Sequence, residues 1–296
     1  MKRNSIGGLF SSVAVALLAG CVGSVPQVGP PAPIAQPLAQ RTGDVQYFSN
    51  VYGGTLLEFD YPRSESPIGS IGFSAGGLCT KGARTFWATG EDEIAEFKVG
   101  SSTPIKVLKA ADYASGCAVE PATGDLAVLD VSDGGVTIFH KARGKGKVIS
   151  GALGEGDFAG YDNQGNLFID GFSSDDRFAL AELKKGSAGF VTIATSNTVK
   201  YPGSVQWDGR YLAVTDQDAD AIYRYAVSGG DATLKGTVLL SGALDCAASW
   251  ITKPYVYCAD AGNNDGEVFK YPAGGSPIAT LGGMDFPLGV VSLHVR

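Results

Sequence analysis

The sequence predicts an all-β fold, a six-bladed β-propeller built from four-stranded blades, and three observations lead to this prediction. Glycine accounts for 42 of the 296 residues, and no amphipathic helical stretch stands out, a composition typical of many short strands joined by tight turns. A short strand that ends in a large apolar residue recurs six times. The interval between recurrences is about 42 residues, the size of one blade.

The N-terminal segment, residues 1–20, has the three parts of a secretory signal peptide. Lys2 and Arg3 provide a basic start, residues 13–18 form an apolar run, and small residues close the segment. The apolar run is too short for a permanent membrane-spanning helix, which needs about 20 apolar residues. We expect this segment to direct export and to be removed.

The residue that follows is Cys21, and the sequence Leu18-Ala19-Gly20-Cys21 resembles the lipobox of bacterial lipoproteins. The resemblance implies that Cys21 is diacylated and that cleavage occurs before it. Because the two or three acyl chains of a lipoprotein bind a bilayer firmly, we expect an anchor in the cell envelope. Val22, in place of an aspartate, favours the outer membrane in a host with two membranes. The alternative is a plain signal peptide followed by an ordinary cysteine.

Residues 21–43 are predicted to form a tether between the lipid and the folded domain. Five prolines, almost no charge and no apolar period predict a semi-rigid, polyproline-like spacer of at most ~65 Å, at ~3.1 Å per residue. Loss of Lys2 and Arg3 lowers the basic residues from 23 to 21 against 30 acidic ones, a net charge of −9. That charge argues against nucleic acid and anionic lipid surfaces as partners.

Residues 44–296 carry the repeat. The third strand of each predicted blade ends in an apolar anchor, at Phe59, Phe97, Phe139, Leu183, Tyr225 and Tyr271. Four of the second strands end in an acid that we interpret as a turn former, at Asp130, Asp170, Asp216 and Asp260. The C-terminus supplies only an innermost strand, 288–293, and the N-terminus supplies a second strand, 45–49. One blade is therefore shared between the two ends, which removes open sheet edges.

A small or apolar innermost strand, a turn such as residues 162–166, a second strand that ends in aspartate and a third that ends in an aromatic residue make up the repeat. This pattern resembles the NHL-repeat family of six-bladed propellers. The resemblance covers residues 44–296 and is degenerate in every blade. It implies the fold rather than the function, because this architecture hosts receptors, scaffolds, lactonases and lyases.

Four cysteines besides Cys21 form an even number in a chain that we expect to reach an oxidising compartment. Cys246 and Cys258 lie on the two strands of one predicted hairpin with its turn midway between them, so we expect them to face each other and form a disulfide. Cys79 and Cys117 share a register on the innermost strands of adjacent blades and could form a second bridge. The alternative is free buried thiols.

Charged residues divide between the two ends of the predicted propeller. The loops before each innermost strand and between the second and third strands are rich in acids, and the loops of the opposite end are rich in bases. At the acidic end, four aspartates directly precede an innermost strand: Asp112, Asp157, Asp245 and Asp285. Aromatic residues accompany them in several blades: Tyr113, Phe158, Tyr201 and Phe286.

These channel-mouth residues allow two interpretations. A ring of carboxylates and aromatic rings could bind a divalent cation such as Ca²⁺, or a cationic ligand, because hard cations take several oxygen ligands. The interpretation that we favour is turn chemistry, in which aspartates accept hydrogen bonds from loop amides and the aromatic rings pack between blades. Residues 216–220 and 260–267 superficially suggest calcium loops, but neither has the EF-hand register.

Several kinds of catalytic chemistry are excluded or disfavoured. The only histidines are His140 and His294, which excludes a multi-histidine zinc site and disfavours a histidine-based lyase. A serine triad lacks its Gly-x-Ser-x-Gly motif, and a phosphate-binding glycine loop lacks a helix to precede. A lactonase would need Glu, Asn and Asp where the innermost strands begin, but glycine occupies most of these positions.

The sequence therefore favours a non-enzymatic function. We expect a monomeric, envelope-tethered scaffold that binds an envelope protein, a glycan or a small ligand at its acidic face, with no cofactor beyond a divalent cation. The alternative is a metal-dependent hydrolase or lactonase centred on the channel-mouth aspartates.

Overall fold

Strands make up almost all of the regular structure in the computed structural model, which describes residues 43–82, 84–109, 113–151 and 153–295. Two short 3₁₀ helices, η3 (His140–Ala142) and η4 (Gln217–Ala219), interrupt the described strands. Within these ranges, no helix has the length and apolar character needed to span a membrane. The predicted all-β class is confirmed.

Four of the sheets have four strands each, and in each of them neighbouring strands are antiparallel. Two sheets follow one another in the chain and contain β4 (Leu78–Cys79), β5 (Thr85–Thr89), β6 (Glu93–Lys98) and β7 (Lys106–Lys109), then β8 (Ala114–Val119), β9 (Leu126–Asp130), β10 (Val136–Phe139) and β11 (Lys147–Ile149). A third contains β20 (Cys246–Thr252), β21 (Tyr255–Asp260), β22 (Asp265–Lys270) and β23 (Ala279–Leu281).

The fourth of these sheets joins the two ends of the described chain. Its order is β24 (Val290–Val295), β1 (Gly43–Asn50), β2 (Thr55–Phe59) and β3 (Gly69–Ile71). Strand β24 pairs with β1 in a register that runs from Gly43 opposite Val295 to Phe48 opposite Val290. The predicted sharing of one sheet between the two ends is confirmed.

The remaining sheet has eight strands rather than the four predicted for every blade. It contains β12 (Glu155–Tyr161), β13 (Leu167–Phe172), β14 (Phe178–Leu183), β15 (Val191–Thr195), β16 (Pro202–Trp207), β17 (Leu212–Asp216), β18 (Ala221–Ser228) and β19 (Asp231–Leu239). Strands β12 to β15 form one antiparallel half and β16 to β19 the other. The halves join because β19 begins beside β15, where Ala194 pairs with Asp231 and Thr195 with Ala232 in parallel.

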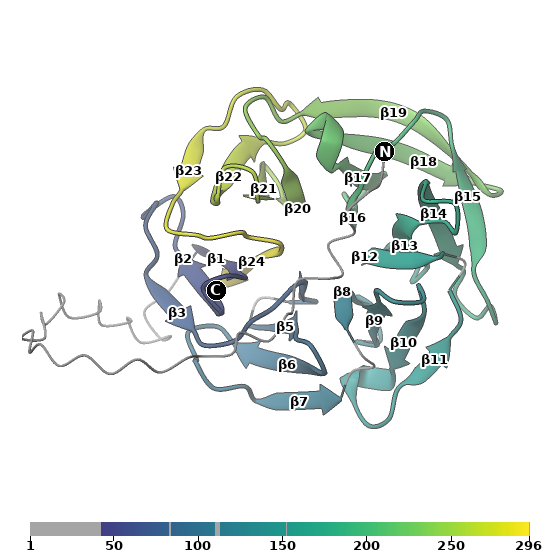
Figure 1. Cartoon of the computed structure of the whole chain (residues 1–296), viewed down its shortest axis with the longest axis horizontal. Helices are drawn as coiled ribbons and strands as arrows, with labels where there is room; N and C mark the ends of the chain where they lie inside the picture. Colours follow the sequence, from purple (N-terminus) through teal and green to yellow (C-terminus); the bar gives the residue numbers. More distant parts are fainter. Residues whose placement is uncertain (1–42, 83, 110–112, 152, 296) are drawn as a thin grey trace, which may run out of the picture. The chain divides into compact units, whose positions relative to one another are not determined.

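The sheets are arranged around a common axis, with β24, β8, β12, β16 and β20 nearest its centre (Figure 1). Side chains of neighbouring sheets pack against one another. Tyr47 of β1, for example, stacks on Phe86 of β5 with ring centroids 4.2 Å apart. All six predicted anchors are buried, with exposed fractions of 7% or less: Phe59, Phe97, Phe139, Leu183, Tyr225 and Tyr271. The arrangement is that of a β-propeller.

Glycines allow the innermost strands to approach one another at the axis. A Cβ atom on Gly116 would lie 2.5 Å from the carbonyl oxygen of Asp157, and one on Gly160 would lie 2.2 Å from that of Val205. The cavity that the innermost strands enclose measures only about 40 Å³. It has room for a few water molecules at most. The glycines within these strands are thus a packing requirement.

Candidate functional site

Two disulfides connect the predicted cysteine pairs. Cys79 of β4 bonds to Cys117 of β8 in the neighbouring sheet, with Cα atoms 5.7 Å apart. Cys246 of β20 bonds to Cys258 of β21, with Cα atoms 5.6 Å apart. The expectation that this second pair lies directly opposed is wrong, because Cys246 pairs with Asp260 and a bulge after it shifts the register.

The second-strand aspartates hold the loops that lead into the innermost strands. The Asp216 carboxylate accepts hydrogen bonds from the amides of Lys200 and Tyr201, at 2.9 and 3.2 Å. Asp260 does the same one repeat later, from Leu244 and Asp245, also at 2.9 and 3.2 Å. Asp216 and Asp260 therefore hold loop amides, in agreement with the structural role predicted for them. Asp170 differs, because its carboxylate accepts a hydrogen bond from the amide of Gly203 on β16 and its Oδ1 atom is buried without a partner.

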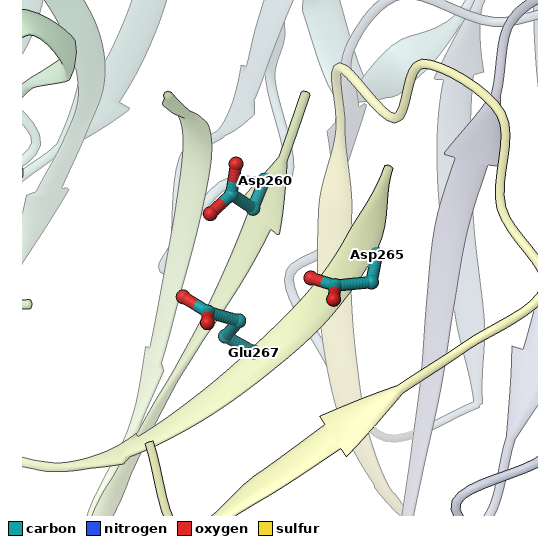
Figure 2. Close-up of side chains that lie close together, drawn as sticks. All are labelled: Asp260, Asp265 and Glu267. Carbon is teal, nitrogen blue, oxygen red and sulfur yellow. The ribbon is translucent and has the colours of Figure 1, made fainter. Parts of the chain in front are cut away.

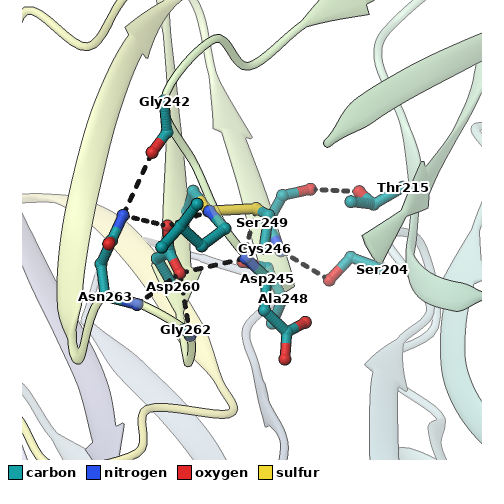
Figure 3. The surroundings of a disulfide bond; sticks show 12 residues. Ser204, Thr215, Gly242, Asp245, Cys246, Ala248, Ser249, Asp260, Gly262 and Asn263 are labelled. Carbon is teal, nitrogen blue, oxygen red and sulfur yellow. Dashed lines mark hydrogen bonds between the residues drawn. A yellow bond between two sulfur atoms is a disulfide. The ribbon is translucent and has the colours of Figure 1, made fainter. Parts of the chain in front are cut away.

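Asp260 accepts further hydrogen bonds from the chain that follows it. The amides of Gly262 and Asn263 each donate to Oδ1 at 2.9 Å, and the Asn263 side chain donates to Oδ2 at 3.0 Å (Figure 3). With its two bonds from the preceding loop, the carboxylate accepts five hydrogen bonds in all. It is therefore rigidly held next to the Cys246–Cys258 disulfide.

The predicted channel-mouth residues fall in separate environments. Asp112 lies outside the described residues. Asp157, Asp245 and Asp285 precede or begin three different innermost strands, and across the described ranges they do not belong to one group of carboxylates with mutually close oxygens. Asp285 is exposed, and its backbone amide donates a hydrogen bond to the side-chain oxygen of Asn50 at 2.6 Å.

The aromatic partners pack locally. Phe286 stacks on Tyr52 with ring centroids 4.8 Å apart, and Tyr201 meets Phe172 edge to face at 5.1 Å. Phe158 is partly buried against the core and lines the small axial cavity. Tyr113 is 48% exposed and adopts a left-handed backbone, φ 57°.

Among the predicted channel-mouth aspartates that the structure describes, Asp157 differs most from a surface carboxylate. It is the extra residue of a bulge in β12, and its Oδ2 atom is buried without a hydrogen-bond partner. Burial, with the nearby charge of Glu155, raises the pKa of Asp157 to about 7. Asp170, fully buried on β13, also has a strongly raised pKa, because it is desolvated and lies near Asp157.

A second group of carboxyls was not predicted as a site. Asp260, Asp265 and Glu267 each offer an oxygen that lies within 4.8 Å of the others, and Figure 2 shows the three side chains directed toward one another. The signal was present in the sequence. Asp260 and Asp265 are opposite each other across the β21–β22 turn, and Glu267, two residues along β22, lies on the same face.

Further acidic residues lie near this cluster of three carboxylates. Burial raises the pKa of Glu267 to about 7, and the charges of Asp260, Asp265 and Asp220 contribute to the rise. Burial, followed by the charges of Asp260 and Asp245, raises the pKa of Asp220 to about 6. Asp265 and Asp245 also have raised pKa values, chiefly through burial and then through Asp260.

A cavity larger than the axial one lies between the β4–β7 sheet and the β8–β11 sheet, at the end opposite the predicted channel mouth. It measures about 550 Å³ and is lined by four bases: Lys81, Arg84, Lys106 and Lys141. We call it the basic groove. Lys106 pairs with Glu96 at 3.2 Å and lies over the Trp87 ring. Lys81, Arg84 and Lys141 are exposed.

Comparisons with known proteins identify the fold. No family model matches the chain, and no curated protein sequence matches it significantly. Among solved structures, a chain in the crystal structure of a nidogen/laminin complex is similar, with a TM-score of 0.69 and 12% identity over 86% of this chain and 100% of that one.

Two bacterial proteins of unknown function have the same likeness. One is from Bacteroides caccae, with a TM-score of 0.65 and 10% identity over 85% of this chain and 99% of that chain. The other is from Desulfotomaculum acetoxidans, with a TM-score of 0.60 and 8% identity over 85% of this chain and 99% of that chain. At such identities the likeness supports the fold alone, a β-propeller.

Proposed function

We propose that this chain is a lipid-anchored scaffold of the cell envelope that binds an anionic ligand in the basic groove. In this proposal the acyl chains on Cys21 hold the protein to the membrane, and the spacer that separates the propeller from the bilayer ends at residue 42, because Gly43, predicted as its last residue, begins β1. The two disulfides support a location outside the cytoplasm, because thiols stay reduced inside most cells.

The propeller has six NHL-like blades in this proposal. Each half of the eight-stranded sheet has the same antiparallel order of four strands as the other sheets, so the whole eight-stranded sheet counts as two blades. The link between the halves consists of two residue pairs at the outer strands, β15 and β19. Such a short outer link is compatible with two separate repeats that meet at their edges.

The observation that carries the binding proposal is the contrast between the two cavities. The axial cavity of about 40 Å³ is too small for a ligand, whereas the basic groove of about 550 Å³ is within the usual range of ligand sites, roughly 300–1,000 Å³. Among the described lining residues the one acid, Glu96, is paired with Lys106, which leaves the exposed charges of Lys81, Arg84 and Lys141 for an oxyanion. A carboxylate- or phosphate-bearing ligand has the matching charge.

Calorimetry with the purified chain tests this site. Citrate, inorganic phosphate and a short oligouronate serve as probes, and we expect at least one to bind saturably. A Lys81→Ala, Lys141→Ala double variant should lose that binding, whereas Lys235→Ala, an exposed lysine on β19 in another sheet, should keep it. Absence of binding by all three probes, or unchanged binding by the double variant, would contradict the groove proposal.

The membrane anchor needs a separate test. Cells that express the chain are fed an alkyne-labelled fatty acid and fractionated, and the wild-type protein should carry the label and sediment with membranes. A Cys21→Ser variant should carry no label and appear in the soluble fraction. An unlabelled wild-type protein would rule out the lipid anchor while leaving the groove experiment unaffected.

A further inference from the structure

The cluster of three carboxylates on the β21–β22 hairpin, Asp260, Asp265 and Glu267, includes two buried oxygen atoms that accept no hydrogen bond. Glu267 is only 4% exposed, and its Oε2 atom is buried without a hydrogen-bond partner. Oδ1 of Asp265, on the same face of β22, is also buried and without one. Buried carboxylates in folded proteins are normally hydrogen-bonded, paired with a base or bound to a metal.

No basic side chain fulfils that requirement. Across the part of the chain that the structure describes, no lysine, arginine or histidine forms an ion pair with Asp260, Asp265 or Glu267. The neighbours that influence these groups electrostatically are further acids, Asp220 and Asp245. The repulsion among these charges calls for a cation.

The three carboxylates are also held in fixed positions. Asp260 is fixed by five hydrogen bonds from the loop before β20 and the turn after β21, so its position does not depend on a ligand. Asp265 and Glu267 lie on a regular strand that pairs with β21 on one side, and Glu267 also pairs with Thr280 of β23 on the other. The Cys246–Cys258 disulfide ties β21 to β20 beside them.

We propose that Asp265 and Glu267, together with Asp260, bind a divalent cation of the calcium class between β21 and β22. Two oxygens on opposite sides of a Ca²⁺ ion are about 4.6–5.2 Å apart, since each Ca–O distance is about 2.3–2.6 Å. The oxygens here lie within 4.8 Å of one another, which meets that limit. The donors are all oxygens, and water molecules complete a shell of six to eight ligands.

Asp265 and Glu267 are the primary ligands, because the oxygens of Asp260 already accept amide hydrogen bonds. Asp220 sits across the boundary with the neighbouring sheet, at the end of η4, and its Oδ1 atom is buried without a partner. The cation would offset the repulsion between Asp220 and the hairpin. This site is distinct from the predicted channel-mouth ring and from the basic groove, so it does not depend on the proposed function.

Calorimetry and thermal unfolding of the purified chain, after treatment with a chelator, test the proposal with CaCl₂ and MgCl₂ as probes. We expect one saturable Ca²⁺ site and a rise in the unfolding midpoint on Ca²⁺ addition. Glu267→Gln keeps the shape of the side chain and removes a charged ligand, so it should weaken Ca²⁺ binding by at least about tenfold. Asp265→Asn, at a less buried position, should do the same.

The matched control is Glu182→Gln. Glu182 lies on β14, is 6% exposed and has a raised pKa caused mainly by burial, but it belongs to no such group of carboxylates in the described chain. Ca²⁺ binding that survives in this control and is lost in both other variants supports the proposal. No saturable binding at about 10 mM Ca²⁺, equal binding by all variants, loss in the control, or a response to Mg²⁺ alone overturns it.

Discussion

The raised pKa of Asp157 predicts that replacing this residue by asparagine stabilises the protein at neutral and alkaline pH. Its pKa rises from an ordinary value of 3.8 to about 7, so the folded protein holds this proton more tightly than the unfolded chain does. Between about pH 4 and pH 7 the folded state therefore binds more protons, and stability falls as the pH rises. Above about pH 7 the full cost of the buried charge is present.

The size of the effect follows from the shift. Three pKa units at 1.36 kcal/mol each give about 4 kcal/mol, an upper bound that local relaxation reduces. Asp157→Asn removes this charge and the repulsion that it exerts on Asp170. The variant should therefore match the wild type near pH 4 and exceed it by about 1–4 kcal/mol at pH 8.

The assay is thermal unfolding of wild type and variant from pH 4 to pH 8. A gain of 1 kcal/mol raises the midpoint by about 2–4 °C for a domain of this size, so the curves should diverge by several degrees at pH 8. Asp285→Asn, at an exposed aspartate, serves as the control and should follow the wild type. Parallel curves for Asp157→Asn and wild type would refute the reasoning.

Two further predictions concern the framework. The Cys79–Cys117 disulfide closes a separation of 38 residues between two sheets, so the Cys79→Ser, Cys117→Ser variant should lose about 4 kcal/mol of stability in urea unfolding. Unchanged stability would mean that the bridge does not constrain the unfolded chain. Gly160→Ala should lose at least about 1–3 kcal/mol, since its Cβ would lie 2.2 Å from a backbone oxygen, whereas Gly189→Ala, with no atom within 4 Å, should change stability by less than about 0.5 kcal/mol. Equal urea midpoints for the two alanine variants would contradict the packing argument.

The repeat could be predicted because it depends on local patterns. The apolar anchors, such as Phe97 and Tyr225, recur with the blade interval and are buried as expected. The pairing of β1 with β24 followed from counting strand types at the two ends. What the repeat did not reveal is the contact of β15 with β19, because it depends on where the long β19 begins relative to a neighbouring repeat.

The acidic residues of the β21–β22 hairpin show more clearly what could not be predicted from the sequence. Asp260 was correctly interpreted as a turn former, but comparison of residues 260–267 with a known calcium loop hid the geometry of Asp265 and Glu267. Their proximity depends on strand register and on which face of β22 is buried, rather than on a loop motif. The glycines of the innermost strands were similarly interpreted as missing ligands, whereas Gly116 and Gly160 mark close contacts between strands.

The pairing of β1 with β24 has a consequence for the order in which the protein is made and folds. The Ser49 hydroxyl accepts a hydrogen bond from the amide of Leu288, 239 residues away, and β1 can find β24 only after the ribosome has made almost the whole chain. Contacts so distant in sequence form slowly. Until then the edge of β1 that pairs with β24 has no partner, while its other edge can already pair with β2.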